Sequence, residues 1–479
     1  MRSLSIVALA MSLLIVPPFR PTPAWGIQET ESSFQLDLAP LKPGLQTITL
    51  EKVKDTVSYL ASDEMAGRAT LTPGFDKAVA YVEGRFKKAG LQPVKGEGFF
   101  HETEVTTTRT PDDEVSLTID GKVWETWGLL SGGAEALSGS FPWQEVSLGD
   151  REIDDVAGIA VCQLEENADS SRWLAQLARL SNRVRLAGGK ALILQVSEDN
   201  GILELAKRLR QPQFENDRTR FMIPVVLMNS KEFPAEELTV NLPQQVREKT
   251  VVRNVLAMLP GSDEALSDEY LLVTAHLDHL PPKDSGEDRI NNGADDNATG
   301  VTAVLTLADA YTSLPKPPAR SIVFMTFWGE ERGLLGSKAY VANPTLPLEK
   351  MVANVNIEMI GRPEAGAHRK VWVTGWEKSD LGPLMAQGAA AVGVTVFEHP
   401  QFSAMLYQAS DNAAFAAKGG IAHSFSAGSL HSDYHQPTDE WEKLDLEHMT
   451  DVIRGLFAAT YPIANGQMTP HVAGDSGGN

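Results

Sequence analysis

The chain has 479 residues, of which 42% are hydrophobic and 22% charged, a composition that supports a packed globular core. Its length favours two or more folding units, or one large α/β domain that carries an insertion. Acidic side chains outnumber basic ones 63 to 42, which gives a formal net charge of −21. So negative a surface disfavours partners such as nucleic acid or anionic membranes.

The N-terminus has the pattern of a signal peptide. A short basic start is followed by an apolar run at residues 4–16, which two prolines end, and Ala24 offers a cleavage point. The run is too short to span a bilayer. We therefore expect residues 1–24 to be removed on export to the periplasm or the extracellular space, leaving no membrane segment. A membrane anchor or a buried helix is the alternative.

Cys162 is the only cysteine. The chain therefore forms no internal disulfide and cannot build a thiolate zinc site. A bound metal would have to be held by histidines and carboxylates.

The pattern of apolar residues divides the mature chain into five segments. We expect a linker, a first catalytic part, an inserted α/β module, a second catalytic part with the metal site, and a disordered polar tail. Their boundaries are 25–46, 47–108, 109–248, 249–467 and 468–479. In the module, alternating apolar residues before Asp120-Gly121 predict a hairpin. None of the candidate catalytic residues lies in that module.

After residue 250, strands alternate with helices. Apolar runs predict strands at 271–275, 322–328 and 351–360, and amphipathic patterns predict helices at 301–314 and 334–341. This alternation favours an α/β fold with a mixed, mostly parallel sheet sandwiched by helices. Such sheets bind ligands at the carboxyl ends of their strands.

Histidines and carboxylates follow or lie in these strands. His276 and Asp278 come after the first strand and point to the same side of an extended segment, so the carboxylate can hold a metal-bound imidazole. Glu330 and Glu331 follow the second strand, and because adjacent residues point in different directions, one can bind metal while the other accepts a proton. Glu358 lies inside an apolar strand, where a lone carboxylate is costly unless paired or metal-bound.

Two further segments carry candidate ligands. Asp295 and Asp296 lie in the Gly-bounded turn 293–300, and two carboxylates there suit a hard or borderline cation. This turn could instead cap the following helix or carry a glycan at Asn297. The loop at 431–437 contains two histidines and a tyrosine. Each signal alone has an ordinary structural explanation, but the set favours a metal site.

Together the motifs resemble those of the di-zinc exopeptidases, which include secreted bacterial leucyl aminopeptidases and glutamate carboxypeptidase II. They are His-x-Asp at 276–278, Gly-Ala-Asp-Asp-Asn-Ala-Thr-Gly at 293–300, Trp-Gly-Glu-Glu-x-Gly-Leu-Leu-Gly-Ser at 328–337, Asn-x-Glu-Met-Ile-Gly-Arg at 356–362 and Tyr-His-Gln at 434–436. The stretch at 60–68 is also similar, so the resemblance covers roughly 50–108 and 250–465. Residues 110–248 resemble, more faintly, the protease-associated domain often inserted in such enzymes.

The resemblance implies a site for two zinc ions (Zn2+). One would be held by His276, Glu358 and Asp296, and the other by Glu331, His435 and Asp296. Asp296 rather than Asp295 matches the family's bridging carboxylate, counted back from Gly300. In relatives this residue precedes a non-proline cis peptide.

The remaining roles follow from the same resemblance. Asp278 would orient His276, Glu330 would be the general base, and Tyr434 would stabilise the oxyanion. In the family, a dizinc-bound water attacks the scissile carbonyl, and the general base takes its proton and returns it to the leaving amine. The chain is therefore expected to be a metallopeptidase that releases N-terminal residues from a peptide substrate.

Two residues depart from the family pattern. Glu358 stands where most aminopeptidase relatives have Asp, and its extra methylene is expected to alter the coordination or to displace the amine-binding position. Asn412 stands where many relatives have His, which leaves specificity open. His279 and His431 have no place in the motifs and are expected to be structural or to support the ligands.

Other activities remain compatible with the motifs. A carboxypeptidase or dipeptidase would use the same zinc pair, with Arg332 or Arg362 available to hold a substrate carboxylate. A single-zinc cyclase acting on N-terminal glutamine and an inactive, receptor-like binding module are further alternatives. The residue preference and the oligomeric state are not encoded in any pattern we recognise.

Overall fold

The computed structural model describes residues 34–474 with internal gaps. The gaps lie at 97, 110, 112–115, 120–121, 125, 165–169, 197–211, 215–222, 229–236, 284–285 and 429. The predicted signal peptide and the Asp120-Gly121 turn fall outside the described residues. No helix within the described ranges is long and apolar enough to cross a membrane.

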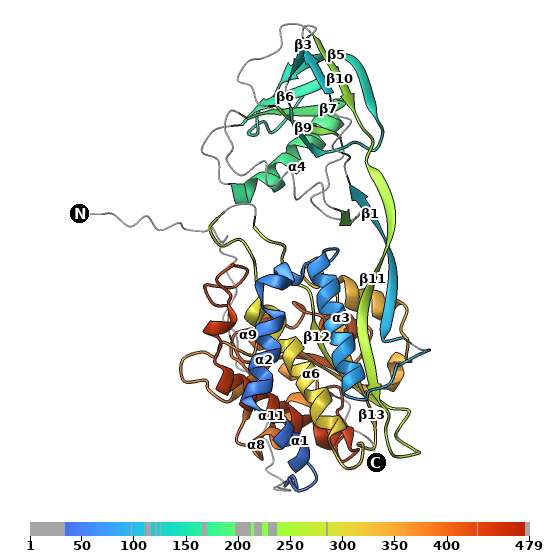
Figure 1. Cartoon of the computed structure of the whole chain (residues 1–479), viewed down its shortest axis with the longest axis vertical. Coiled ribbons are helices and arrows are strands. Elements are labelled where there is room, and N and C mark those ends of the chain that lie inside the picture. Colours follow the sequence, from blue (N-terminus) through green and yellow to red (C-terminus); the bar gives the residue numbers. More distant parts are fainter. Residues whose placement is uncertain are drawn as a thin grey trace, which may run out of the picture. The chain divides into compact units, whose positions relative to one another are not determined.

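The larger of two β-sheets has nine strands and is mixed. In spatial order its strands are β16 (Thr395–Phe397), β15 (Lys370–Val373), β17 (Ala422–Ser426), β14 (Met351–Glu358), β12 (Tyr270–His276), β13 (Ser321–Phe327), β11 (Val246–Leu259), β1 (Phe100–Arg109) and β8 (Gln213–Phe214). Strands β1, β11, β12 and β13 of this sheet are labelled in Figure 1. The central strands β17, β14, β12 and β13 run parallel, whereas β11, β1 and β8 extend the sheet in antiparallel pairs. The predicted mixed α/β sheet is therefore confirmed, with its parallel part at the centre.

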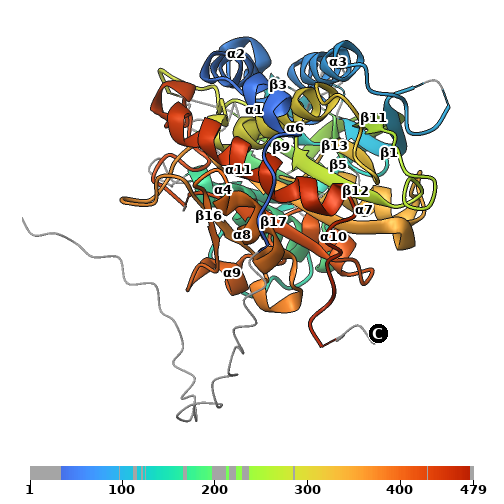
Figure 2. The same cartoon turned by 90° about the horizontal axis from the view of Figure 1, so that it is seen from below.

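Helices accompany this sheet along the chain. They are α1 (Lys42–Thr47), α2 (Leu50–Leu60), the short η1 (Asp63–Arg68), α3 (Pro73–Lys88), α6 (Thr299–Thr312), α7 (Leu335–Ala342), α8 (Leu381–Ala390), α9 (Phe402–Met405), α10 (Asn412–Ala416) and α11 (Leu446–Ala464). Figure 2 shows α2, α3 and α6 on one side of β12 and β13, with α7 and α10 on the other.

Strand β13 shows why both faces must be covered. All seven of its residues are buried, and successive side chains point to opposite faces. Phe324 lies 6.5 Å from Phe86 of α3 and 6.3 Å from Tyr311 of α6, measured between ring centroids. Phe327 lies 6.0 Å from Phe415 of α10 on the other face. The strand is apolar throughout because it has no solvent-facing side.

A second sheet has eight strands, and all of them lie within residues 109–248. In spatial order they are β3 (Lys122–Trp124), β2 (Ser116–Ile119), β10 (Glu237–Leu242), β5 (Leu137–Glu145), β6 (Ile159–Gln163), β7 (Ala191–Gln195), β9 (Val225–Met228) and β4 (Thr126–Ser131). Strands β2 and β3 pair antiparallel, with Ile119 opposite Lys122, as the hairpin prediction requires. With helix α4 (Ser170–Leu186) the sheet builds its own hydrophobic core. Its likeness to a protease-associated domain stays a prediction.

Parts of the predicted linker and of the predicted disordered tail are ordered in the structure. Helix α1 begins at Lys42, inside the predicted linker, because Leu41 and Ile48 at its ends are fully buried. In the predicted disordered tail, the main-chain oxygen of Met468 accepts a hydrogen bond from buried Arg320, and Val472 forms a β-bridge with Ser379. Polar composition alone did not reveal these main-chain contacts.

Candidate metal centre

Three neighbouring parallel strands deliver candidate ligands to one edge of the sheet. His276 is the last residue of β12 and pairs in register with Phe327, the last residue of β13. Glu331 follows β13, and Glu358 is the last residue of β14, on the other side of β12. Because the carboxyl ends of parallel strands meet at one edge, side chains from distant parts of the sequence converge there.

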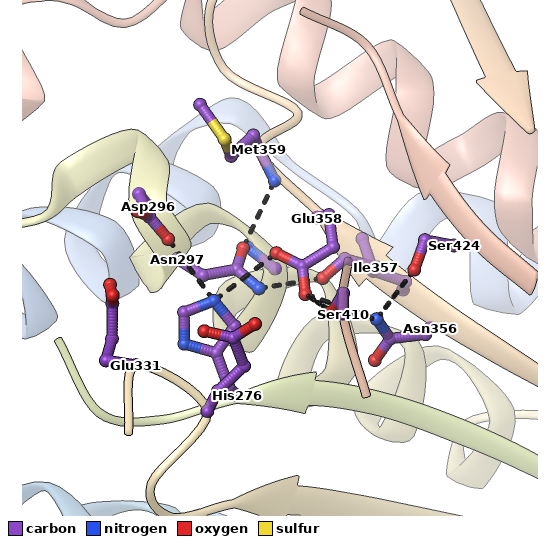
Figure 3. A network of polar contacts seen from close by, with 12 residues as sticks. His276, Asp296, Asn297, Glu331, Asn356, Ile357, Glu358, Met359, Ser410 and Ser424 are labelled. Atoms are coloured by element: carbon purple, nitrogen blue, oxygen red, sulfur yellow. Dashed lines mark hydrogen bonds and ion pairs between the residues drawn. The ribbon is translucent and has the colours of Figure 1, made fainter. Parts of the chain in front are cut away.

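Asp296 comes from the turn that opens α6. The Asp296–Asn297 peptide is cis, as in the family that the motifs resemble. The Asn297 amide nitrogen donates to Ile357 O at 2.9 Å, and its oxygen accepts from the backbone N–H groups of Gly300 (2.9 Å) and Met359 (3.2 Å). This side chain therefore fastens the turn to β14 (Figure 3). The Asn297 side chain is buried and both of its amide atoms are hydrogen-bonded, so it is not a glycan acceptor in the folded chain.

The two carboxylate oxygens of Asp296 face two different groups of ligands. Its Oδ1 lies 3.2 Å from His276 Nε2, which is also 3.4 Å from Glu358 Oε2. Its Oδ2 lies 3.1 Å from His435 Nε2, which is also 3.3 Å from Glu331 Oε2. The structure thus brings the five predicted ligands together as two clusters that share Asp296.

His435 has the signature of a metal ligand. Its Nε2 atom is buried and has no hydrogen-bond partner among the described residues, although carboxylate oxygens lie 3.1 and 3.3 Å away. Buried ring nitrogens are rarely left unbonded, so these atoms are arranged around a common centre rather than toward one another. A site of imidazole and carboxylate ligands, with no thiolate, suits zinc.

His279, which the sequence led us to expect as a structural or supporting residue, also reaches this second cluster. Its Nδ1 atom is 2.7 Å from Glu331 Oε1 and 3.7 Å from Asp296 Oδ2, close enough to count as an alternative third ligand. The short hydrogen bond to Oε1 leaves Glu331 Oε2 directed at His435. His279 thus lies where it can either bind a metal in place of His435 or fix the Glu331 carboxylate as an outer partner.

The buried carboxylates and imidazoles of the clusters shift one another's pKa values. Burial opposes a charge on His276, but Glu358, Glu330 and Asp296 outweigh burial and raise its pKa well above the ordinary value. Burial likewise opposes the Asp296 carboxylate, yet the adjacent His276 and His435 rings hold its pKa well below the usual range. Metal binding would displace the histidine protons.

The expected supporting residues surround the same clusters. His276 Nδ1 is 2.9 Å from the main-chain oxygen of Asp278 but 4.0 Å from its carboxylate. Asp278 therefore orients His276 through its backbone, while its Oδ1 accepts the backbone N–H of Glu330 at 3.1 Å. The Tyr434 ring stacks on His435 with centroids 3.8 Å apart.

Glu358 is held by a polar network that explains how its longer side chain fits. Its Oε1 accepts from Ser410 Oγ at 2.5 Å and from Asn356 Nδ2 at 3.2 Å, which leaves Oε2 to face His276 (Figure 3). Asn356 also donates to Ser424 Oγ, which in turn donates to the Asn412 side-chain oxygen at 2.8 Å. Asn412 thus supports this network from behind.

A cavity of about 110 Å³ opens beside the first cluster. Its polar lining includes His276, Asp296, Glu330, Glu358 and Tyr434. Its apolar lining includes Met359, Trp372, Phe402, Leu406 and Leu430. The described lining therefore combines carboxylates from the clusters with large apolar side chains.

His431, which had no role in the motifs, lies against Asp295. Its Nε2 atom is 3.2 Å from Asp295 Oδ2, whose other oxygen accepts the backbone N–H of Gly361 at 2.8 Å. Asp295 is therefore engaged in structural contacts, which leaves Asp296 as the carboxylate of the turn that faces both clusters.

Comparison with known proteins agrees with this geometry. The model of Peptidase family M28 matches residues 254–460. Aminopeptidase YwaD of Bacillus subtilis is 25% identical over 360 residues, 70% of this chain and 71% of that protein. Leupeptin-inactivating enzyme 1 of Streptomyces exfoliatus is 35% identical over 114 residues, 24% of each chain.

Solved structures share the fold. A zinc aminopeptidase from Bacillus subtilis superposes with a TM-score of 0.54 at 18% identity, over 88% of this chain and 97% of that one. An aminopeptidase from an Aneurinibacillus strain gives a TM-score of 0.51 at 20% identity, over 88% and 96% of the two chains. The segment that matches the family model contains all five residues of the two clusters. Residues 254–460 therefore match the model of Peptidase family M28, and the chain is a metallopeptidase.

Proposed function

We propose that the chain is an exported aminopeptidase that binds two zinc ions and releases N-terminal residues from peptides. The observation that carries this proposal is the division of the Asp296 carboxylate between two histidine- and carboxylate-containing clusters. His276 and Glu358 would hold one ion, Glu331 and His435 the other, and Asp296 both. When bound, such a pair polarises the scissile carbonyl and makes water a stronger nucleophile at neutral pH.

Glu330 is the proposed general base. It lines the cavity beside His276 and Glu358, and its backbone N–H is fixed by the Asp278 carboxylate. Its neighbour Glu331 contacts His279 and His435, so the carboxylate of Glu330 is not needed as a ligand. It can therefore accept a proton from the attacking water and pass it to the leaving amine.

Tyr434 is the proposed donor to the oxyanion. It lines the same cavity, and its ring is held parallel to that of His435, with 20° between the ring planes. Burial raises the pKa of its hydroxyl, and the surrounding carboxylates add to this effect. The phenol therefore stays protonated at working pH and can donate a hydrogen bond to developing negative charge.

The charge of the cavity favours an amine over a carboxylate as the anchored end of the substrate. No lysine or arginine is present among the described lining residues, whereas three carboxylates are. Arg362, a possible carboxylate anchor, is engaged by Asp433 at 3.2 Å from both guanidinium nitrogens. A carboxypeptidase needs a cation at this place. The names of the Bacillus subtilis relatives support the same choice.

A binding module without activity and a single-zinc cyclase fit less well. Both clusters are complete, and the candidate base lies beside them. Export is supported by the signal-like pattern of residues 1–24.

We expect Glu330→Gln to retain bound zinc but to lower kcat by about 10²–10⁴-fold, because the amide cannot take a proton. Stopped-assay kinetics and metal analysis on the same preparation test this. Glu442→Gln, which changes an exposed glutamate, is the matched control and should leave both quantities unchanged. Near-normal turnover in Glu330→Gln would show that another group is the base.

Comparing His435→Ala with His279→Ala tests which of the two histidines binds zinc and which only orients Glu331. We expect His435→Ala to lose about one zinc ion per chain, whereas His279→Ala keeps both ions with about 10–100-fold weaker affinity. Zinc content after dialysis and chelator competition provide the readouts, with exposed His471→Ala as the control. The opposite pattern would make His279 the ligand.

A substrate panel tests the class of peptidase. We expect cleavage of leucyl chromogenic substrates with a free amine, and at least about 100-fold lower kcat/KM after N-acetylation, because the carboxylates of the cavity lining are then left unpaired. The metal-free protein and Glu330→Gln provide the blanks. Cleavage confined to N-blocked substrates with a free carboxylate would identify a carboxypeptidase.

A further inference from the structure

The turn that precedes α3 has an unusual backbone. Ala66, Gly67 and Arg68 all have positive φ, at 45°, 77° and 53°. Residues other than glycine avoid positive φ, and they keep such a conformation only where the surrounding structure holds it. A Cβ atom on Gly67 would lie 2.2 Å from Leu280 O and 2.8 Å from Asn291 O. The turn is therefore pressed against the two loops that follow His276 and precede Asp296.

Arg68 occupies the space between these loops. It is 1% exposed, and its Nε donates to Leu277 O at 3.1 Å. Its terminal nitrogens donate to Asn292 O at 2.7 Å and to Gly293 O at 3.0 Å. A fourth hydrogen bond, to Leu60 O at 2.6 Å, fixes the guanidinium to the end of α2.

These acceptors are adjacent to the metal ligands. Leu277 directly follows His276, and Gly293 begins the turn that contains Asp296. The structure records no ion pair between Arg68 and a carboxylate within the described ranges. The guanidinium therefore donates three of its four hydrogen bonds to main-chain oxygens of the two loops that carry His276 and Asp296, which we call the ligand loops.

Asp439 binds the backbone N–H groups of the same turn. Its carboxylate accepts from the backbone nitrogens of Asp295 at 3.1 Å and of Asp296 at 3.2 Å. Its own main-chain oxygen accepts from Ala294 N at 3.0 Å. Asp439 is fully buried and lies in the loop that also carries His435. Arg68 therefore hydrogen-bonds to carbonyl oxygens at the start of the turn, and Asp439 accepts hydrogen bonds from its N–H groups.

We propose that Arg68 and Asp439 form a clamp that sets the position of Asp296 relative to His276 and so aligns the shared carboxylate with both clusters. Arg68 is a positioning residue, since its hydrogen bonds go to main-chain oxygens of the loops. The clamp rests on the proposed zinc site of the preceding subsection. It adds a function for the 60–68 stretch, which contributes none of the ligands.

Loss of the Arg68 charge and loss of its hydrogen bonds are expected to change zinc affinity in opposite directions. A buried cation near the clusters repels a metal cation, so removal of its charge alone would strengthen zinc binding. Loss of the four hydrogen bonds would loosen the ligand loops and weaken binding. A lysine keeps the charge, but it presents its donors from a single point and lacks the guanidinium fork.

The test compares Arg68→Lys, Arg68→Met and Asp439→Asn with the wild type. Zinc affinity is measured by chelator competition on the metal-free proteins, and folding is checked by circular dichroism and Tm. We expect each variant to bind zinc about 10–100-fold more weakly. Asp439→Asn keeps the volume of the side chain but replaces one acceptor oxygen by a donor, so it decides the matter if the Arg68 variants do not fold.

Arg320→Lys is the matched control. Arg320 is also buried and donates to main-chain oxygens of Ile463 and Met468, but these lie outside the ligand loops. We expect this variant to lower Tm without changing zinc affinity.

Three outcomes would overturn the clamp. Unchanged zinc affinity in folded Arg68→Lys and Asp439→Asn would do so while leaving the peptidase assignment intact, if the wild type binds zinc and cleaves peptides. Tighter zinc binding by Arg68→Met would show that Arg68 acts through charge. A wild type that takes up no zinc would overturn the zinc site and the clamp together.

Discussion

The sharing of one buried carboxylate by two clusters is the constraint on which the rest of the site depends. Asp296 must present one oxygen to His276 and the other to His435, and these histidines come from segments about 160 residues apart in the chain. A carboxylate can bridge two centres only if both of its lone-pair directions are fixed. The turn 293–300 provides this, because its side chains and backbone are bonded to β14, to Asp439 and to Arg68.

The sheet brings the candidate ligand residues to the same region, and hydrogen bonds then fix the orientation of their side chains. Parallel strands β12, β13 and β14 end together, which brings histidine and carboxylates to one edge. Three of the candidate ligands are also held so that one atom is left facing its cluster: His276 by a main-chain oxygen, Glu358 by Ser410 and Asn356, and Glu331 by His279. A side chain fixed in this way loses little conformational freedom on binding, which favours tight coordination.

The sequence predicted the strands, and it predicted candidate ligands that the structure brings together, because both signals are local. Apolar runs mark buried strands, and motifs of three to ten residues mark the loops that follow them. Arg68 and Asp439 were not predicted, since the contacts that define their roles join residues between 143 and 225 positions apart. His279 was expected only to be structural or to support the ligands, and its contact with Glu331 spans 52 positions. One signal was present for Arg68: an arginine directly after Ala-Gly in a turn otherwise made of small residues. The ordered ends at α1 and at 468–473 were missed for a similar reason, because they are held by main-chain contacts that leave no pattern in composition.

The most direct measurement is the zinc content of Asp296→Asn beside that of the wild type, after exhaustive dialysis against zinc-buffered solution. If the Asp296 carboxylate is shared, the wild type holds about two zinc ions per chain and the variant loses both. Circular dichroism should show that the variant remains folded. Retention of one tightly bound zinc by folded Asp296→Asn would contradict the account, because one cluster would then be complete without the shared carboxylate.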